Sequence, residues 1–133
     1  MIGLLLLAVL LGGCSFAEES DRGERAVARF HQLFAASRYA DIYVDTTENF
    51  REAATEAEFV EFLAAVRRKL GNVRACERTG LEVNWDGDGT SIWLSYETAY
   101  ELGIATEQFV WVMDGEKAHL DGYQIDSREL ILR

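Results

Sequence analysis

The spacing of apolar residues changes along the chain from a helical period to a strand period. From residue 21, apolar residues recur every three or four positions: Ala26, Val27, Phe30, Leu33 and Phe34. This spacing predicts a helix over residues 21–37 with one apolar face. A second, shorter helix is expected over residues 39–46, with Ile42 and Tyr43 facing inward.

The third predicted helix carries signals at both ends. Thr55 and Glu58 fit a capping box, in which the threonine side chain caps the first turn and the glutamate reaches back. Residues 67–69 are all cationic and lie in the last turn, where the helix dipole favours positive charge. Gly71 then supplies the stop. A helix is therefore expected over residues 55–70.

After Gly71 the apolar period falls to two, which is typical of strands. Alternation is clear over residues 81–85 and 92–99, and the Asp-Gly-Asp-Gly run between them predicts a turn. Further strands are expected over residues 106–113 and 117–125, joined by a tight Asp-Gly hairpin. This order predicts an α+β fold in which N-terminal helices pack on a curved four-stranded antiparallel sheet.

The N-terminal segment has a different character, because its first 13 residues carry no charge. The apolar run within it is too short for the roughly 20 residues that span a bilayer, but it has the length of a signal peptide core. It ends in Leu11-Gly12-Gly13-Cys14, which resembles the lipobox of bacterial lipoproteins, where the cysteine is lipidated. One departure is that no Lys or Arg precedes the apolar run. The alternative is an apolar N-terminal helix packed into a core.

The lipobox interpretation divides the chain into three parts and predicts where the protein is located. Residues 1–13 are expected to be a lipoprotein signal peptide, 14–20 the lipidated Cys14 with a short polar tether, and 21–133 a single α+β domain. The lipid, with palmitate among its chains, would anchor the protein to a membrane of the cell envelope, facing the periplasm. Ser15 after the cysteine, rather than aspartate, favours the outer membrane in the enterobacterial sorting pattern.

Composition narrows the classes of partner. The chain has 23 acidic and 13 basic residues, a formal net charge of -10. This balance argues against a nucleic-acid partner, since phosphate binding needs clustered Lys and Arg. Once Cys14 is lipidated, Cys76 is alone, and it is either buried and inert, which we favour, or exposed and reactive. Two histidines and one cysteine give a metal site little to work with, and no cofactor is implied.

Candidate chemistry is sparse. His119 and Asp121 lie two apart on one predicted strand and share a face unless Gly122 introduces a bulge. With Tyr39 or Tyr43 from the second helix they would form an acid–base site. The alternative is that both are solvated near a hairpin end.

His31 borders the apolar face of the first helix and is interpreted as a structural histidine. Trp93 and Trp111 lie on strands whose two faces both carry apolar residues. They are candidate interface residues, for an envelope protein partner or for a homodimer through the sheet. The alternative is ordinary packing under the helices and the C-terminal tail.

From about residue 24 to 130 the chain resembles a family of short bacterial envelope proteins of unknown function, whose fold is similar to nuclear transport factor two, a cystatin-like α+β cone. The likeness rests on Ser37-Arg38-Tyr39-Ala40, Leu70-Gly71, Tyr96-Glu97-Thr98-Ala99-Tyr100, Glu107, Asp114-Gly115 and Gly122-Tyr123-Gln124-Ile125-Asp126-Ser127. The resemblance implies a cone that can enclose a pocket. Some cone proteins, such as ketosteroid isomerases and scytalone dehydratase, use that pocket for acid–base chemistry, and others only bind partners. The family has no established catalytic set.

Together these observations predict a lipid-anchored envelope protein with a non-catalytic binding domain. The alternative is a small-ligand-binding protein or an acid–base enzyme that uses the cone pocket at Tyr39, Tyr43, His119 and Asp121.

Overall fold

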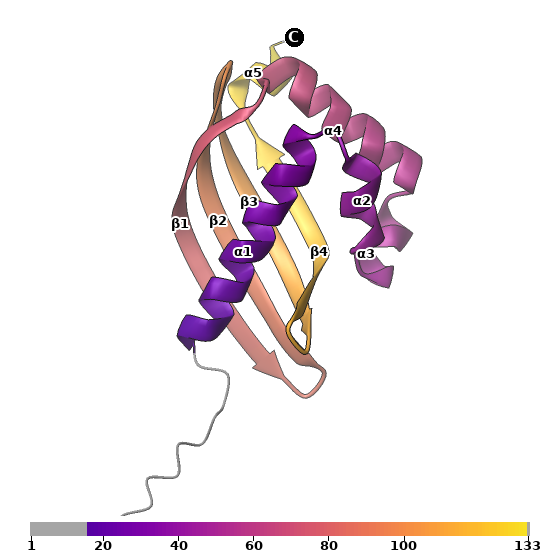
Figure 1. Cartoon of the computed structure of the whole chain (residues 1–133), viewed down its shortest axis with the longest axis vertical. Helices are drawn as coiled ribbons and strands as arrows, with labels where there is room; N and C mark the ends of the chain where they lie inside the picture. Colours follow the sequence, from indigo (N-terminus) through magenta and orange to yellow (C-terminus); the bar gives the residue numbers. More distant parts are fainter. Residues whose placement is uncertain (1–15, 133) are drawn as a thin grey trace, which may run out of the picture.

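The computed structural model describes residues 16–132, which form helices and one four-stranded sheet (Figure 1). The helices of this part of the chain are α1 (Phe16–Ala35), α2 (Tyr39–Val44), α3 (Glu48–Ala53), α4 (Glu56–Leu70) and α5 (Arg128–Ile131). The strands are β1 (Val73–Asp86), β2 (Gly89–Tyr100), β3 (Gly103–Asp114) and β4 (Lys117–Asp126). The predicted α+β class is confirmed.

The sheet is an open antiparallel meander in the order β1-β2-β3-β4. Each strand pairs with the next in sequence, because short turns join all of them. Register shifts interrupt β1 at two places and the β3–β4 pair at one. Such bulges increase local twist and bend a sheet. The sheet is curved, with α1 across one face and α2, α3 and α4 gathered beside β4 (Figure 1).

The core lies between the inner face of this sheet and the apolar faces of α1 and α4. Its most completely buried apolar residues are Phe34, Leu63, Leu70, Ile92, Leu94, Phe109 and Leu120. Burial of each such side chain contributes roughly 1.5–3 kcal/mol before the cost of ordering the chain. No described helix is long and apolar enough to cross a membrane.

The first helix begins earlier than predicted. It starts at Phe16, so residues 16–20 belong to the folded domain and are not a polar tether. Most of these residues are polar, which suggested an exposed tether, but those that are buried form polar contacts within the domain. Glu19 forms an ion pair with Arg22 at 2.9 Å, and the Ser20 hydroxyl accepts a 2.7 Å hydrogen bond from Arg78 of β1. These contacts extend the helix by five residues beyond its apolar period.

Gly23 lets α1 lie close to β2. A Cβ at this position would come within 2.7 Å of Leu94 Cδ1 and 3.0 Å of Ile92 Cγ2. Contacts below 3 Å force the packing to shift, so a side chain here would displace Leu94 or α1. The position therefore determines how closely α1 approaches the inner face.

The other helices agree with the sequence signals to different degrees. α4 has the predicted cap, with the Glu58 amide donating to Thr55 Oγ1 at 3.2 Å, and it ends at Gly71 with φ 76°. α2 ends at Val44, two residues earlier than expected. α3 was not predicted from the sequence; its N-cap is Thr47.

Candidate functional site

A cleft of about 380 Å³ lies between α1, α2 and the β3–β4 hairpin. It is lined by Arg22, Arg25, Ala26, Arg29, Phe30, Leu33, Asp41, Ile42, Asp45, Trp111, Glu116, Lys117, Ala118 and Leu120. Its volume falls within the range of about 300–1,000 Å³ that is usual for small-molecule sites. The cleft is therefore the candidate binding site of this domain.

The floor of the cleft is apolar because α1, α2 and the β3–β4 pair turn their inner faces toward it. Phe30 and Leu33 come from the apolar stripe of α1, and Ile42 from α2. Trp111 and Leu120 are partners across the β3–β4 ladder on the inner face of the sheet. An apolar floor of this kind favours an apolar group in whatever binds here.

Most charges around the cleft are paired within the protein. Arg22 pairs with Glu19 and lies 3.8 Å from Glu116. Lys117 Nζ lies 3.2 Å from Asp45 Oδ1. Asp41, the remaining acid in the lining, accepts a 2.7 Å hydrogen bond from Arg38, which lies outside the cleft. These pairs leave little net charge among the groups that take part in them.

Arg25 and Arg29 are the exception. They are exposed, they stand four residues apart on α1, and both line the cleft. Residues four apart are neighbours on one face of a helix. Neither guanidinium forms an ion pair or hydrogen bond with another described residue. In a chain of net charge -10, two adjacent arginines without carboxylate partners give the rim a local positive charge.

Trp111 adds an unused donor to the floor. It is 5% exposed and stacks on Phe109 with the rings 5° from parallel. Its indole Nε1 is buried and has no hydrogen-bond partner among the described residues. A buried donor without an acceptor costs about 1–3 kcal/mol. Because this nitrogen is itself buried, a ligand in the cleft does not reach it in this conformation.

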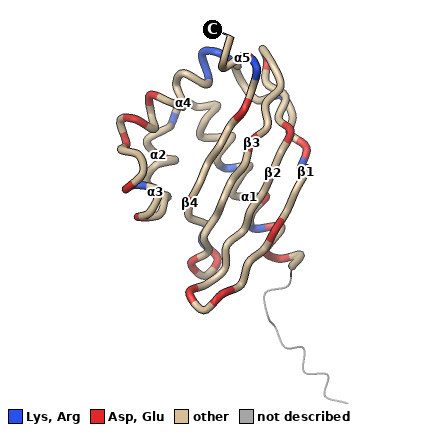
Figure 2. Tube along the Cα trace, turned by 180° about the vertical axis from the view of Figure 1, so that it is seen from behind, with Lys and Arg blue, Asp and Glu red and all other residues tan. Residues whose placement is uncertain are grey.

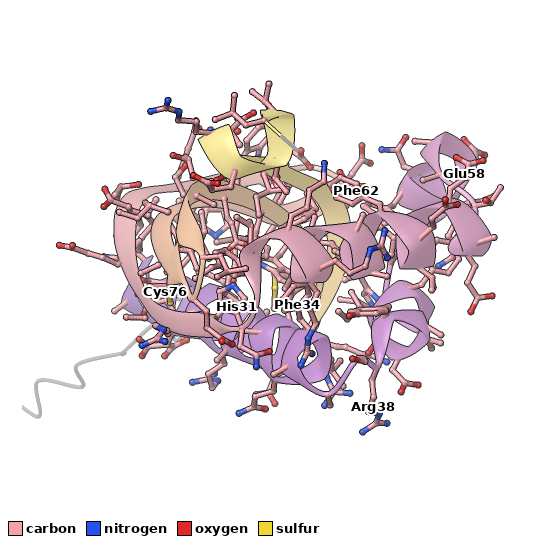
Figure 3. All side chains as sticks on the ribbon, turned by 90° about the horizontal axis from the view of Figure 1, so that it is seen from above. His31, Phe34, Arg38, Glu58, Phe62 and Cys76 are labelled. Atoms are coloured by element: carbon pink, nitrogen blue, oxygen red, sulfur yellow. The ribbon has the colours of Figure 1, made fainter. Side chains whose placement is uncertain are left out.

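A separate cluster of polar side chains is buried under α1. Glu107 of β3 is 0% exposed. Its Oε1 lies 2.9 Å from His31 Nε2, and its Oε2 accepts a 2.5 Å hydrogen bond from the Tyr123 hydroxyl. Nε2 must carry the proton in this contact, because an ionised carboxylate only accepts. Figure 3 shows His31 between α1 and the sheet, on the same side of the helix as Phe34.

The electrostatics of this cluster favour the ionised carboxylate. Burial by itself raises the pKa of Glu107, but the hydrogen bond and charge of His31 and the hydrogen bond of Tyr123 outweigh it, so the net pKa is lowered. Burial, followed by the Glu107 charge, raises the pKa of Tyr123 well above its ordinary value. The pKa of Tyr100, which also faces Glu107, is raised for the same reasons. Both tyrosines therefore stay protonated hydrogen-bond donors.

Access to the cluster is restricted. Neither His31 nor Glu107 lines the α1–β4 cleft. Tyr123 lines a second hollow, beside α3 and α4 near Phe50 and Phe62, yet its hydroxyl is bonded to the buried carboxylate. These hydrogen bonds hold α1 against β3 and β4. A substrate would have to pass through this packing to reach the cluster.

The four candidate pocket residues do not share a site. Tyr39 is buried against Phe34, with ring centroids 5.9 Å apart. The Tyr43 hydroxyl donates to the Ala54 carbonyl at 2.8 Å. Neither tyrosine forms a hydrogen bond with His119 or Asp121 in the described structure.

A bulge separates His119 from Asp121. His119 pairs with Val112 on the outer face and lies 4.0 Å from Asp114, at the tip of the hairpin. Trp111 and Val110 pair with residues 120 and 122, which leaves Asp121 as the extra residue. Its Oδ1 accepts a 2.6 Å hydrogen bond from the Thr47 hydroxyl, at the start of α3. The shared face expected for an undistorted strand is therefore absent.

The two candidate interface tryptophans lie on opposite faces of the sheet. Trp93 is 50% exposed and projects from the outer face, beside a shallow hollow that also includes Gln108 and Val110. Trp111 belongs to the core, so its assignment as an interface residue is wrong. A partner on the outer face would therefore meet Trp93 without Trp111.

Cys76 is exposed on β1, so the favoured expectation of a buried cysteine is wrong. Partial burial, and then the charges of Glu107 and Glu24, raises the pKa of its thiol. A raised pKa lowers the thiolate fraction at neutral pH and slows its reactions. No group of three or more potential metal ligands is assembled among residues 16–132.

Sequence reasoning missed the residues that matter most here. The alternation of β3 places Glu107 in phase with Ala105, Phe109 and Trp111, and that signal predicts an inward carboxylate. The partner, His31, lies 76 positions away, which no local pattern reveals. The sequence does show that Arg25 and Arg29 lie beside the apolar stripe of the first helix. It does not show which cations lack partners in the folded domain.

Comparison with known proteins adds no identity. No protein-family model matches the chain, and none of the curated proteins is detectably similar to it in sequence.

Proposed function

We propose that this is a lipid-anchored protein of the bacterial cell envelope, and that its domain binds a ligand in the α1–β4 cleft without catalysing a reaction on it. The observation that carries the binding function is the cleft itself. It combines an apolar floor with two rim arginines that have no partner in the described part of the chain.

The anchor rests on Leu11-Gly12-Gly13-Cys14, which precedes the described residues. The resemblance to cone-shaped envelope proteins is consistent with the α+β architecture, in which helices pack on a curved sheet. In this proposal the protein faces the periplasm, with the outer membrane favoured by Ser15. An envelope protein partner, or a second copy joined through the sheet, would use the outer face around Trp93.

The start of α1 supports a position of the cleft near the membrane. Only Ser15 separates Cys14 from the first residue of α1. Figure 1 shows that α1 begins at the same end of the domain as the β1–β2 and β3–β4 turns. Glu116 and Lys117 of the second turn line the cleft. A lipid on Cys14 would therefore hold this end of the domain, and the cleft with it, close to the bilayer.

Charge also limits how the domain can sit on the membrane. Acidic residues gather at both hairpin tips, at Asp86, Asp88, Asp114 and Glu116 (Figure 2). Anionic headgroups repel such tips. The lipid would consequently tether the domain, while the tips keep it from lying flat against an anionic surface.

Catalysis has less support than binding. The proposed acid–base residues Tyr39, Tyr43, His119 and Asp121 are bonded or packed in different places. The histidine–carboxylate pair that does exist, at His31 and Glu107, is covered by α1. Binding is therefore the function that the geometry supports best.

The first test is the intact mass of the protein extracted from membranes with detergent. We expect a mass that shows loss of residues 1–13 and gain of acyl chains. The Cys14→Ser variant should show neither change, while a Cys76→Ser variant should be processed as the parent is. An unmodified full-length chain in the parent would contradict the anchor and favour a cytoplasmic ligand-binding protein.

A further inference from the structure

We propose that the α1–β4 cleft binds a single-chain amphiphile with one anionic head group, of the fatty-acid type. This inference rests on the proposed binding function and names the ligand class of the same site. It combines the apolar floor with the two rim arginines.

The charges at the rim of the cleft indicate that the ligand has an anionic head group. Glu19, Asp45 and Arg38 already neutralise the charges of Arg22, Lys117 and Asp41. What remains is a pair of guanidiniums, Arg25 and Arg29, on one face of α1. Guanidinium groups bind carboxylate and phosphate oxygens through charge-assisted hydrogen bonds. Each acidic residue that lines the cleft already lies beside a basic side chain, so a cationic ligand would find no unpaired carboxylate there. The longest of these contacts is the 3.8 Å between Glu116 and Arg22.

The apolar floor of the cleft indicates that the ligand has an apolar tail. Phe30, Leu33, Ile42 and Leu120 are each buried by more than nine-tenths and border the cleft together. A cleft of about 380 Å³ lies near the lower limit of small-molecule sites. One acyl chain suits that size better than two.

The position of the cleft agrees with this chemistry. In the proposed anchored state it lies at the end of the domain next to the bilayer, where single-chain amphiphiles are present. A domain tethered there would meet such ligands at high local concentration.

The test uses decanoate and the full-length Cys14→Ser chain, which cannot be lipidated. Trp85 and Trp93 are changed to phenylalanine, so that Trp111 is the one remaining tryptophan and its fluorescence reports on the cleft floor. Binding is measured from this signal and, independently, by calorimetry. Decanol is the uncharged comparison, and acetate tests the head group alone.

Decanoate should bind about tenfold more tightly than decanol, the effect expected of two exposed charge pairs. From hexanoate to decanoate the affinity should rise by about fourfold for each methylene that reaches the floor. Arg25→Gln with Arg29→Gln should remove the preference for decanoate and leave decanol binding unchanged. Arg68→Gln with Arg74→Gln removes the same charge elsewhere and should change neither.

Three results would overturn the proposal. The first is equal affinity for decanoate and decanol, and the second is an equal loss of affinity in the two double variants. The third is binding of the Cys14→Ser chain to phosphatidylglycerol vesicles that depends on Arg25 and Arg29, because the arginines would then serve a membrane surface. Failure of any of these tests leaves the mass measurement on Cys14 unaffected, so the ligand class and the envelope anchor can fail separately.

Discussion

The buried carboxylate of Glu107 allows a sharp prediction about stability and pH. Glu107→Gln keeps the size and shape of the side chain and removes its charge. The charged form receives hydrogen bonds from His31 at 2.9 Å and from Tyr123 at 2.5 Å. The lowered pKa of Glu107 means that these contacts favour the carboxylate more than burial opposes it. Removing the charge should therefore destabilise the fold.

The magnitude can be worked from the two contacts. A hydrogen bond to a charged group contributes about 1.5–3 kcal/mol, and one between neutral groups about 0.5–1.5 kcal/mol. Glutamine can keep both contacts in neutral form, so the loss is about 1 kcal/mol for each. We expect Glu107→Gln to lower the free energy of unfolding by about 2 kcal/mol at pH 6. In urea this corresponds to a midpoint lower by roughly 1 M.

The pH dependence follows from the direction of the pKa shift. The folded pKa of Glu107 lies below its ordinary value of 4.5, so the stabilisation is complete above that value. It is lost as the pH falls through the folded pKa, where the parent carboxyl becomes neutral like the amide. The difference between parent and variant should therefore be largest at pH 6 and should shrink below pH 4.5.

The assay is urea unfolding of both proteins from pH 6 down to pH 3, followed by circular dichroism. Comparing differences cancels the other acidic residues, which titrate in both proteins. Glu97→Gln on the exposed face of β2 is the matched control and should change stability little. A difference for Glu107→Gln that stays constant with pH, or a variant as stable as the parent, would refute the reasoning.

Two further predictions concern packing and the free thiol. Gly23→Ala should destabilise the fold by about 1–3 kcal/mol in the same urea assay, because its Cβ would lie 2.7 Å from Leu94 Cδ1. Gly87→Ala, where no atom lies within 4 Å, is the control, and similar losses at both positions would argue against close packing as the cause. Cys76 in the Cys14→Ser chain should react with iodoacetamide without denaturant, at a rate that still rises at pH 9 because its pKa is raised above 9.0. A rate that levels off below pH 8 would contradict that direction.

Local signals in the sequence were sufficient for much of the fold. The cap at Thr55 and the stop at Gly71 define α4 because each acts through backbone groups within one turn. Period-two alternation, with Asp-Gly turns, identified all the strands of the described sheet and their antiparallel order. These elements could be predicted because the interactions that form them join residues close together in the chain.

The site depended on contacts between distant parts of the chain. Residues 16–20 belong to α1, and Ser20 there meets Arg78, a contact that spans 58 positions. Asp121 leaves the face of His119 because its carboxylate binds Thr47 across 74 positions.

The sequence by itself therefore determined α4, the four strands of the described sheet, the α+β class and the acidic balance of this protein. Tertiary structure alone decided which charges are paired. Arg25 and Arg29 look like any other surface cations in the sequence. They become a candidate anion site because folding gives the neighbouring charges partners and gives these two none among residues 16–132. Glu107 likewise gains its role only when His31 and Tyr123 reach it. The physical reason is that burial and pairing are properties of three-dimensional neighbours, which the order of residues along a chain does not specify.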